Sequence, residues 1–251
     1  MNAPSALLIF SFATVVVAGY VRGYGGFGFS MITVAALSLF FAPVQVVPVV
    51  LLLEVAASLF LLPGVWRQVN WPVLSMLLIG VAAGTPVGVW MLGNISPAPM
   101  KMAVAAIIFM LALLLRQGYV VKRRLKRLDE VAAGLAAGVF NGAAAIGGPP
   151  AILFFFSSPI GAAVSRASLI AFFLATDILA AGICTAVGLM TAGHVRQALI
   201  LAFPMAVGLF LGKQAFIRTP ERVFRRRVLL CLMMLSLLTL VRSAKDVFNL
   251  N

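Results

Sequence analysis

Apolar residues dominate the chain in long runs, and short polar or glycine-rich breaks divide these runs into ten segments. A transmembrane helix needs about 20 predominantly apolar residues, and several of the segments reach that length. The pattern therefore predicts an all-α polytopic membrane protein. The segments cover 5–22, 27–41, 44–64, 72–93 and 98–116 in the first half, and 129–141, 149–158, 165–190, 195–216 and 221–242 in the second.

The two halves of the chain repeat one pattern, which predicts an internal duplication. We divide the chain into a first transmembrane repeat at 1–118, a basic cytoplasmic linker at 119–128 and a second transmembrane repeat at 129–251. The segment 5–22 has a counterpart in the second half, so we expect it to belong to the mature fold and not to a signal peptide. In order along the chain, Gly19–Gly23 corresponds to Gly138–Gly142, Glu54 to Asp177, Gly84–Gly88 to Gly208–Gly212, and Ser96-Pro97 to Thr219-Pro220.

Each half begins with two short segments that a glycine-rich stretch joins. Residues 149–158 would reach only about 15 Å as a helix, which is half of a bilayer core. If the two segments form a hairpin that returns to its starting side, each half keeps three full spans. Because three is an odd number of spans, the second repeat would then be inverted relative to the first. If the two segments instead join into one broken span, each half has four spans and the repeats are parallel.

The distribution of Lys and Arg favours the inverted arrangement. With the linker in the cytoplasm and Arg22 left out, inverted repeats place 14 basic residues inside and four outside, whereas parallel repeats place 10 inside and eight outside. Because basic loops stay on the cytoplasmic side, we predict inverted repeats. Trp66 and Trp71 flank Arg67, as interfacial aromatic residues do.

Composition agrees with the membrane assignment and removes two other classes of protein. Of the 251 residues, 63% are hydrophobic and only 10% are charged, which is too few for the surface of a soluble domain. The net charge of +13 could suggest a nucleic-acid partner, but the basic residues lie in short loops between apolar segments. HExxH and GxSxG motifs are absent, so we predict neither an enzyme nor a cofactor or metal site. Cys184 and Cys231 fall inside apolar segments as small hydrophobes.

The two glycine-rich hairpin tips, 22–30 and 141–150, are the predicted substrate site. Inverted repeats with interrupted helices place their sites near the midplane, where helix N-termini offer N–H groups to an anion. Arg22 and Asn141 hold equivalent positions, and an arginine at membrane depth is a functional candidate whose planar fork suits an oxyanion. A structural ion pair with Glu54 is the alternative. The predicted substrate-binding residues are Arg22, Gly23, Tyr24, Gly25, Gly26, Ser30, Asn141, Gly142, Gly147 and Gly148.

Other residues inside the segments are predicted to have roles other than direct substrate binding. Glu54 and Asp177 are the acids within apolar segments, so they are candidates for proton coupling, or else they hydrogen-bond the hairpins. Glycine at every fourth position, as in Gly80, Gly84 and Gly88, predicts close helix packing. His194 is expected to be a polar helix-end residue. Further cavity-lining candidates are Thr33, Thr85, Thr176 and Lys213.

The chain resembles the TauE/SafE family over nearly its whole length. The resemblance rests on the duplicated layout, on the stretch Gly138–Pro150 with its Gly-Gly-Pro-Pro end, and on the Gly-x-x-x-Gly pair late in each half. Arg22 departs from that family, where a small residue is more usual. The resemblance implies a transporter of sulfite, sulfonates or related carboxylates in the cell (inner) membrane. We expect a small anion and the lipid bilayer as partners, and a homodimer as one arrangement. The alternatives are an anion channel or a membrane scaffold protein.

Overall fold

The computed structural model describes residues 3–96, 127–157 and 162–218, with isolated positions elsewhere, and the regular elements in these ranges are all helical. The helices lie where the apolar pattern predicts them. The predicted segments 98–116 and 221–242 lie almost wholly outside the described residues. The elements are α1 (Ala3–Gly25), α2 (Phe29–Leu37), α3 (Pro43–Leu61), the 3₁₀ turns η1 (Leu62–Gly64) and η2 (Trp66–Gln68), α4 (Trp71–Asn94), α6 (Arg127–Ala144), α7 (Gly148–Ser157), α8 (Ala162–Ala186) and α9 (Ala192–Arg218).

Five stretches in the described ranges are long and apolar enough to cross a membrane, so the chain is a multi-pass membrane protein. By contrast, α2 and α7 have only 9 and 10 residues, which is about half of a bilayer core. The five stretches are Leu7–Gly25, Pro43–Gly64, Trp71–Asn94, Ala163–Ala186 and Ala192–Phe216.

The first helix is longer than the short hairpin arm expected from the sequence. α1 has 23 residues and continues through Arg22 and Gly23 to Gly25. The helix continues because Arg22 is fully buried and paired with protein groups, so that its charge does not end the apolar span. The first hairpin therefore has one full-length arm, α1, and one short arm, α2.

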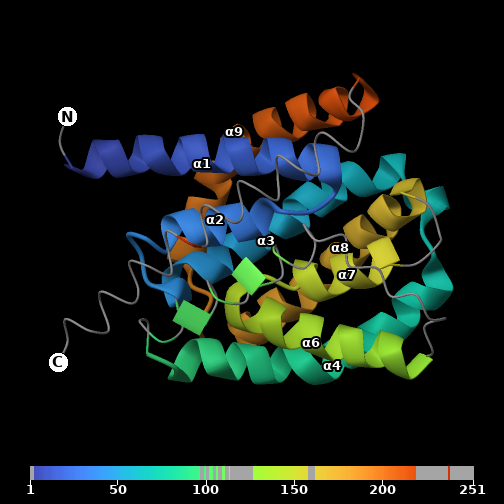
Figure 1. Cartoon of the computed structure of the whole chain (residues 1–251). Helices are drawn as coiled ribbons and strands as arrows, with labels where there is room; N and C mark the ends of the chain where they lie inside the picture. Colours follow the sequence, from blue (N-terminus) through green and yellow to red (C-terminus); the bar gives the residue numbers. More distant parts are fainter. Residues whose placement is uncertain are drawn as a thin grey trace.

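Two pairs of helices flank the centre of the molecule. α1 packs against α9 on one side and α4 packs against α6 on the other, while α2, α3, α7 and α8 lie between the pairs (Figure 1). Both pairs are parallel, and α1 runs opposite to α4 (Figure 1). The first helix of each half therefore packs against the fourth helix of the other half.

Glycines let the backbones of each pair touch. A Cβ on Gly84 would meet the carbonyl oxygen of Leu135 in α6, and a Cβ on Gly208 would meet that of Val16 in α1. This close packing is the role that the four-residue glycine spacing predicts.

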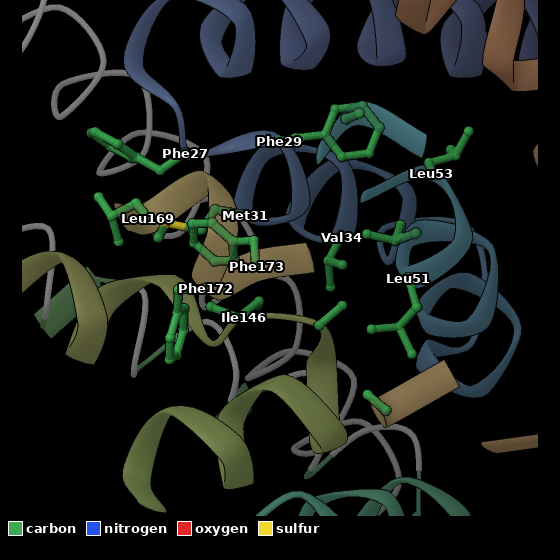
Figure 2. Packing of buried hydrophobic residues seen from close by; sticks show 14 of the residues in the cluster. Phe27, Phe29, Met31, Val34, Leu51, Leu53, Ile146, Leu169, Phe172 and Phe173 are labelled. Carbon is green, nitrogen blue, oxygen red and sulfur yellow. The ribbon is translucent and has the colours of Figure 1, made fainter. Parts of the chain in front are cut away.

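The core between the flanking pairs is formed by large apolar side chains. Figure 2 shows Met31 of α2 beside Phe173 of α8, with Ile146 close to them at the turn before α7. At one end of the molecule, the rings of Trp66 and Trp71 lie 4.5 Å apart and are exposed on either side of Arg67. Exposed tryptophans beside an arginine are typical of a membrane interface.

Candidate functional site

Arg22, at the end of α1, has no exposed surface, and protein groups surround its guanidinium. Nη1 donates to the carbonyl oxygen of Gly26 at 2.8 Å, and Nη2 donates to Ser58 Oγ at 2.7 Å. Nη2 also lies 3.0 Å from the carboxylate of Glu54, and the guanidinium carbon lies 4.4 Å from the centre of the Phe173 ring. The ion pair with Glu54, which the sequence left as an alternative, is present in the fold.

The glycines of the first tip, residues 22–30, make this arrangement possible. Gly26 and Gly28 have φ values of 76° and 95°, which lie in the left-handed region that favours glycine. The turn at Gly26 brings its carbonyl back to Arg22, and the turn at Gly28 starts α2 beside the guanidinium. Thus α2 begins next to a buried positive charge.

Glu54 joins the first tip to the middle of α3. One carboxylate oxygen accepts the backbone N–H of Ser30 at 3.1 Å, and the other lies against Arg22. The first turn of a helix has N–H groups without partners inside the helix, and a carboxylate satisfies them well. Glu54 therefore pairs with Arg22 and also accepts an N–H group of the first turn of α2.

The second tip, residues 141–150, has a similar construction without an arginine. Asn141 donates through Nδ2 to Asp177 at 2.9 Å and accepts the N–H of Gly147 through Oδ1 at 3.2 Å. Ala145 has a φ of 55°, although it is not a glycine. Asn141 thus links the turn to an acid of α8, as Arg22 links its turn to an acid of α3.

The two tips approach each other across a layer of apolar side chains. Phe173 lies over Arg22 of the first tip, and a Cβ on Gly148 of the second tip would come within 3.2 Å of the same ring. Met31, which follows Ser30, also lies beside Gly148, as does Ile152 of α7. Glu54 and Asp177, one from each half, are also close enough to interact electrostatically. The structure therefore brings both predicted tips and both predicted acids into one buried region.

Two residues of this region were missed by the sequence analysis. Arg166 of α8 donates from Nε and Nη2 to the carbonyl oxygens of Tyr24 and Gly23, at 3.0 and 2.7 Å, so it caps the end of α1. Ser58 lies four residues after Glu54 on the same face of α3 and shares its contact with Arg22. The helical spacing could have identified Ser58, and an arginine inside the predicted segment 165–190 could have identified Arg166.

Several predicted site residues have packing partners in the fold. A Cβ on Gly23 would meet the backbone of Leu209 in α9, and a Cβ on Gly142 would meet that of Thr85 in α4. Tyr24 is buried with its ring 5.6 Å from Phe216, and Gly25 ends α1 half-buried.

The secondary polar residues divide into buried and exposed groups. Thr33, Thr85 and Thr176 are fully buried, and the last two donate to backbone carbonyls of their own helices. Lys213 is exposed, and His194 is half-buried at the start of α9, where its Nδ1 lies 3.1 Å from Thr191 N. His194 is thus a helix-end residue, as predicted.

One hollow of the described structure lies away from the two tips. It has a volume of about 620 Å³, and mostly apolar side chains of α1, α2, α3 and α9 line it, with Gln45 and His194 among the polar ones. Its lining contains no residue of either tip. In residues 3–96, 127–157 and 162–218, no three His, Cys, Asp or Glu side chains gather as metal ligands.

Comparison with known proteins adds a family and one relative. The family model described as sulfite exporter TauE/SafE matches residues 11–240. A protein of Cupriavidus necator named as a probable sulfite/organosulfonate exporter TauE is 27% identical over 202 residues, which cover 78% of each chain. No solved structure matches the chain.

Proposed function

The chain belongs to the sulfite exporter TauE/SafE family, a family of membrane transporters, and from this membership we propose that it is a secondary transporter of a small anion. The anion is sulfite, an organosulfonate or a related carboxylate, in keeping with the name of the Cupriavidus necator relative. The observation that carries the proposal is Arg22, a fully buried cation in the glycine-lined break before α2. The predicted homodimer stays a prediction.

The chemistry of the first tip suits an oxyanion. A guanidinium presents parallel N–H donors that match two oxygens of a sulfonate, sulfite or carboxylate. The N-terminus of α2 adds backbone N–H groups and the positive end of a helix dipole beside the same cation. We assign Arg22 and the backbone of 23–30 to the anion, with Asn141, Gly142, Gly147 and Gly148 lining the site from the second tip.

We place this site at the interface of two inverted repeats. Support comes from the helix pairs, because α1 packs parallel to α9 while α6 packs parallel to α4 and in the opposite direction. Support also comes from the turns, because Gly26 and Ala145 have positive φ and each follows its tip residue by four positions. A site between such repeats near the midplane can be opened first to one side and then to the other.

We further propose that transport is proton-coupled through Glu54 and Asp177. Both side chains are 1% exposed and each contacts the equivalent residue of its own tip. Ionisable groups inside a transmembrane bundle are expensive to keep, and proton relays are one of their regular uses.

Binding by purified protein tests the assignment of Arg22. We expect sulfite or a short alkanesulfonate to raise the melting temperature of the wild-type protein with dose. Arg22→Lys keeps the charge and loses the fork, so the affinity should fall by about 10- to 150-fold, which corresponds to a charge-assisted bond of roughly 1.5–3 kcal/mol.

Arg67→Lys is the matched control, because Arg67 is exposed in the turn between α3 and α4. It should bind like the wild type. Unchanged affinity in a folded Arg22→Lys protein would place the site elsewhere.

A further inference from the structure

Glu54 occupies two of the donors that the proposed site offers to an anion. Its carboxylate accepts the N–H of Ser30 at 3.1 Å and lies 3.0 Å from Nη2 of Arg22. Arg22 has no exposed surface, and Glu54 is 1% exposed. In this form of the protein, the carboxylate of Glu54 is already bound to the groups that an arriving anion would need.

We propose that Glu54 is a tethered competitor of the transported anion, and that it releases Arg22 and the start of α2 only when it takes up a proton. The inference rests on the proposed function and adds to it an order of events. The carboxylate of Glu54 gains one proton and becomes a neutral carboxyl, which no longer pairs with the guanidinium. The anion then binds to Arg22 and to the start of α2 in place of the carboxylate.

One donor of Arg22 is already free to begin this exchange. Its Nε is buried and has no hydrogen-bond partner among the described residues, while Nη1 and Nη2 are both engaged. An oxyanion can bind across Nε and Nη2 in the bidentate geometry that arginine offers. The Nε–H thus provides one half of the anion site, and the Nη2 that Glu54 contacts provides the other half.

The charges around Glu54 explain why a proton should accompany the anion. Among the described residues, Arg22 of α1 and Asp177 of α8 face it, and Arg166 of α8 lies beside Arg22. α2 and α4 contain no charged residue, and the charged residues of α6 and α9 lie near the helix ends.

An extra buried charge is costly in an interior without water. Binding an anion alone adds one negative charge to the cluster, whereas binding it with one proton leaves the net charge unchanged. The proton and the anion therefore move together, in the same direction.

An acceptor for the neutral carboxyl is also present. Oδ2 of Asp177 is buried without a hydrogen-bond partner in the described part of the chain, and Asp177 interacts electrostatically with Glu54. A protonated Glu54 that turns from Arg22 toward Asp177 would find a hydrogen-bond acceptor in this oxygen.

The pH dependence of binding tests the inference, with a short alkanesulfonate as the probe because it stays anionic at every pH used. In the wild type, the dissociation constant should rise about tenfold per pH unit once Glu54 is charged, since one proton binds with each anion. Glu54→Gln should bind equally well across the range, as tightly as the wild type does at low pH. Glu130→Gln, an acid near the start of α6, is the matched control and should keep the wild-type slope.

Calorimetry on the wild-type protein provides a second test that does not depend on a variant. In two buffers of different ionisation enthalpy, binding should take up about one proton per anion. Binding without proton uptake would overturn the inference and leave the proposed function intact, whereas no binding at any pH would overturn the proposed function itself. A flat profile in Asp177→Asn together with the wild-type slope in Glu54→Gln would assign the proton to Asp177 and also overturn it.

Discussion

Arg22 has a structural role in the fold and, in the proposed function, the role of the anion-binding cation. Its guanidinium contacts Gly26, Ser58 and Glu54, so it closes a turn and joins α1 to α3. The same group is the cation that an anion needs. A substitution at this position therefore has to be measured for stability as well as for binding.

Removal of Arg22 should reveal the cost of an unpaired buried acid. Arg22→Ala leaves Glu54 buried without its cation, and we expect a loss of about 3–5 kcal/mol, seen as a lower melting temperature in detergent. Glu54→Gln added to Arg22→Ala should recover most of that loss, because the remaining amide carries no charge.

Ser58→Ala is the control for the loss of a single contact with the guanidinium, and its cost should be no more than about 3 kcal/mol. Equal instability of Arg22→Ala with and without Glu54→Gln would contradict the ion pair as the cause.

The sequence identified the buried polar residues of the two tips more completely than their contacts. Arg22, Asn141, Glu54 and Asp177 stood out because charged or amide groups are rare inside apolar segments. The pairing of Arg22 with Glu54 could only be offered as an alternative. The two residues lie 32 positions apart on different helices, and the sequence does not show whether those helix faces meet. Phe173 could not be found at all, because one phenylalanine among many has no distinguishing pattern.

At the scale of helices, the glycine stripes decide which backbones touch. Gly84 faces Leu135 and Val139 of α6, whereas no described atom lies within 4 Å of a Cβ placed on Gly182 of α8. The two glycines are both inside transmembrane helices, so they form a matched pair for substitution.

We expect Gly84→Ala and Gly182→Ala to have opposite effects. In Gly84→Ala the new methyl group collides with the carbonyl of Leu135, which must push α4 and α6 apart and lower the melting temperature. In Gly182→Ala the alanine has room and the higher helix propensity, worth about 0.5–1 kcal/mol, so the protein should be as stable or more stable. Thermal denaturation in one detergent compares them, and equal destabilisation would contradict the packing described for α4.

Helix positions were predicted well from the sequence, and helix partners were not. Apolar length and breaking residues are local signals, and they located α3, α4, α8 and α9 closely. A stripe of small residues indicates that another helix packs closely against it, but it does not show which helix that is. The pairing of α1 with α9 and of α4 with α6 therefore required the structure.

For the whole molecule, the predicted topology rests on charge. In the inverted arrangement the linker 119–128 faces the cytoplasm with Arg67, and the N-terminus faces outside. Arg166, which the charge count placed in the cytoplasm, is buried at the end of α1 in the fold. Trp66 and Trp71 beside Arg67 are exposed, as an interface requires. Single-cysteine variants at positions 2 and 124, each with Cys184 and Cys231 replaced, test this with an impermeant thiol reagent on intact cells. Position 2 should react and position 124 should not, and the reverse result would contradict the inverted repeats.

Transport itself is the central claim, and counterflow in proteoliposomes tests it most directly. Vesicles loaded with unlabelled alkanesulfonate or sulfite and containing the wild-type protein should transiently accumulate the labelled anion, because a carrier exchanges the two across one alternating site. Arg22→Lys should slow this exchange, and Arg67→Lys should not. Transient accumulation that depends on Arg22 is the result we predict. Labelled anion that only equilibrates, without accumulation against the trapped pool, would indicate a channel and contradict the account.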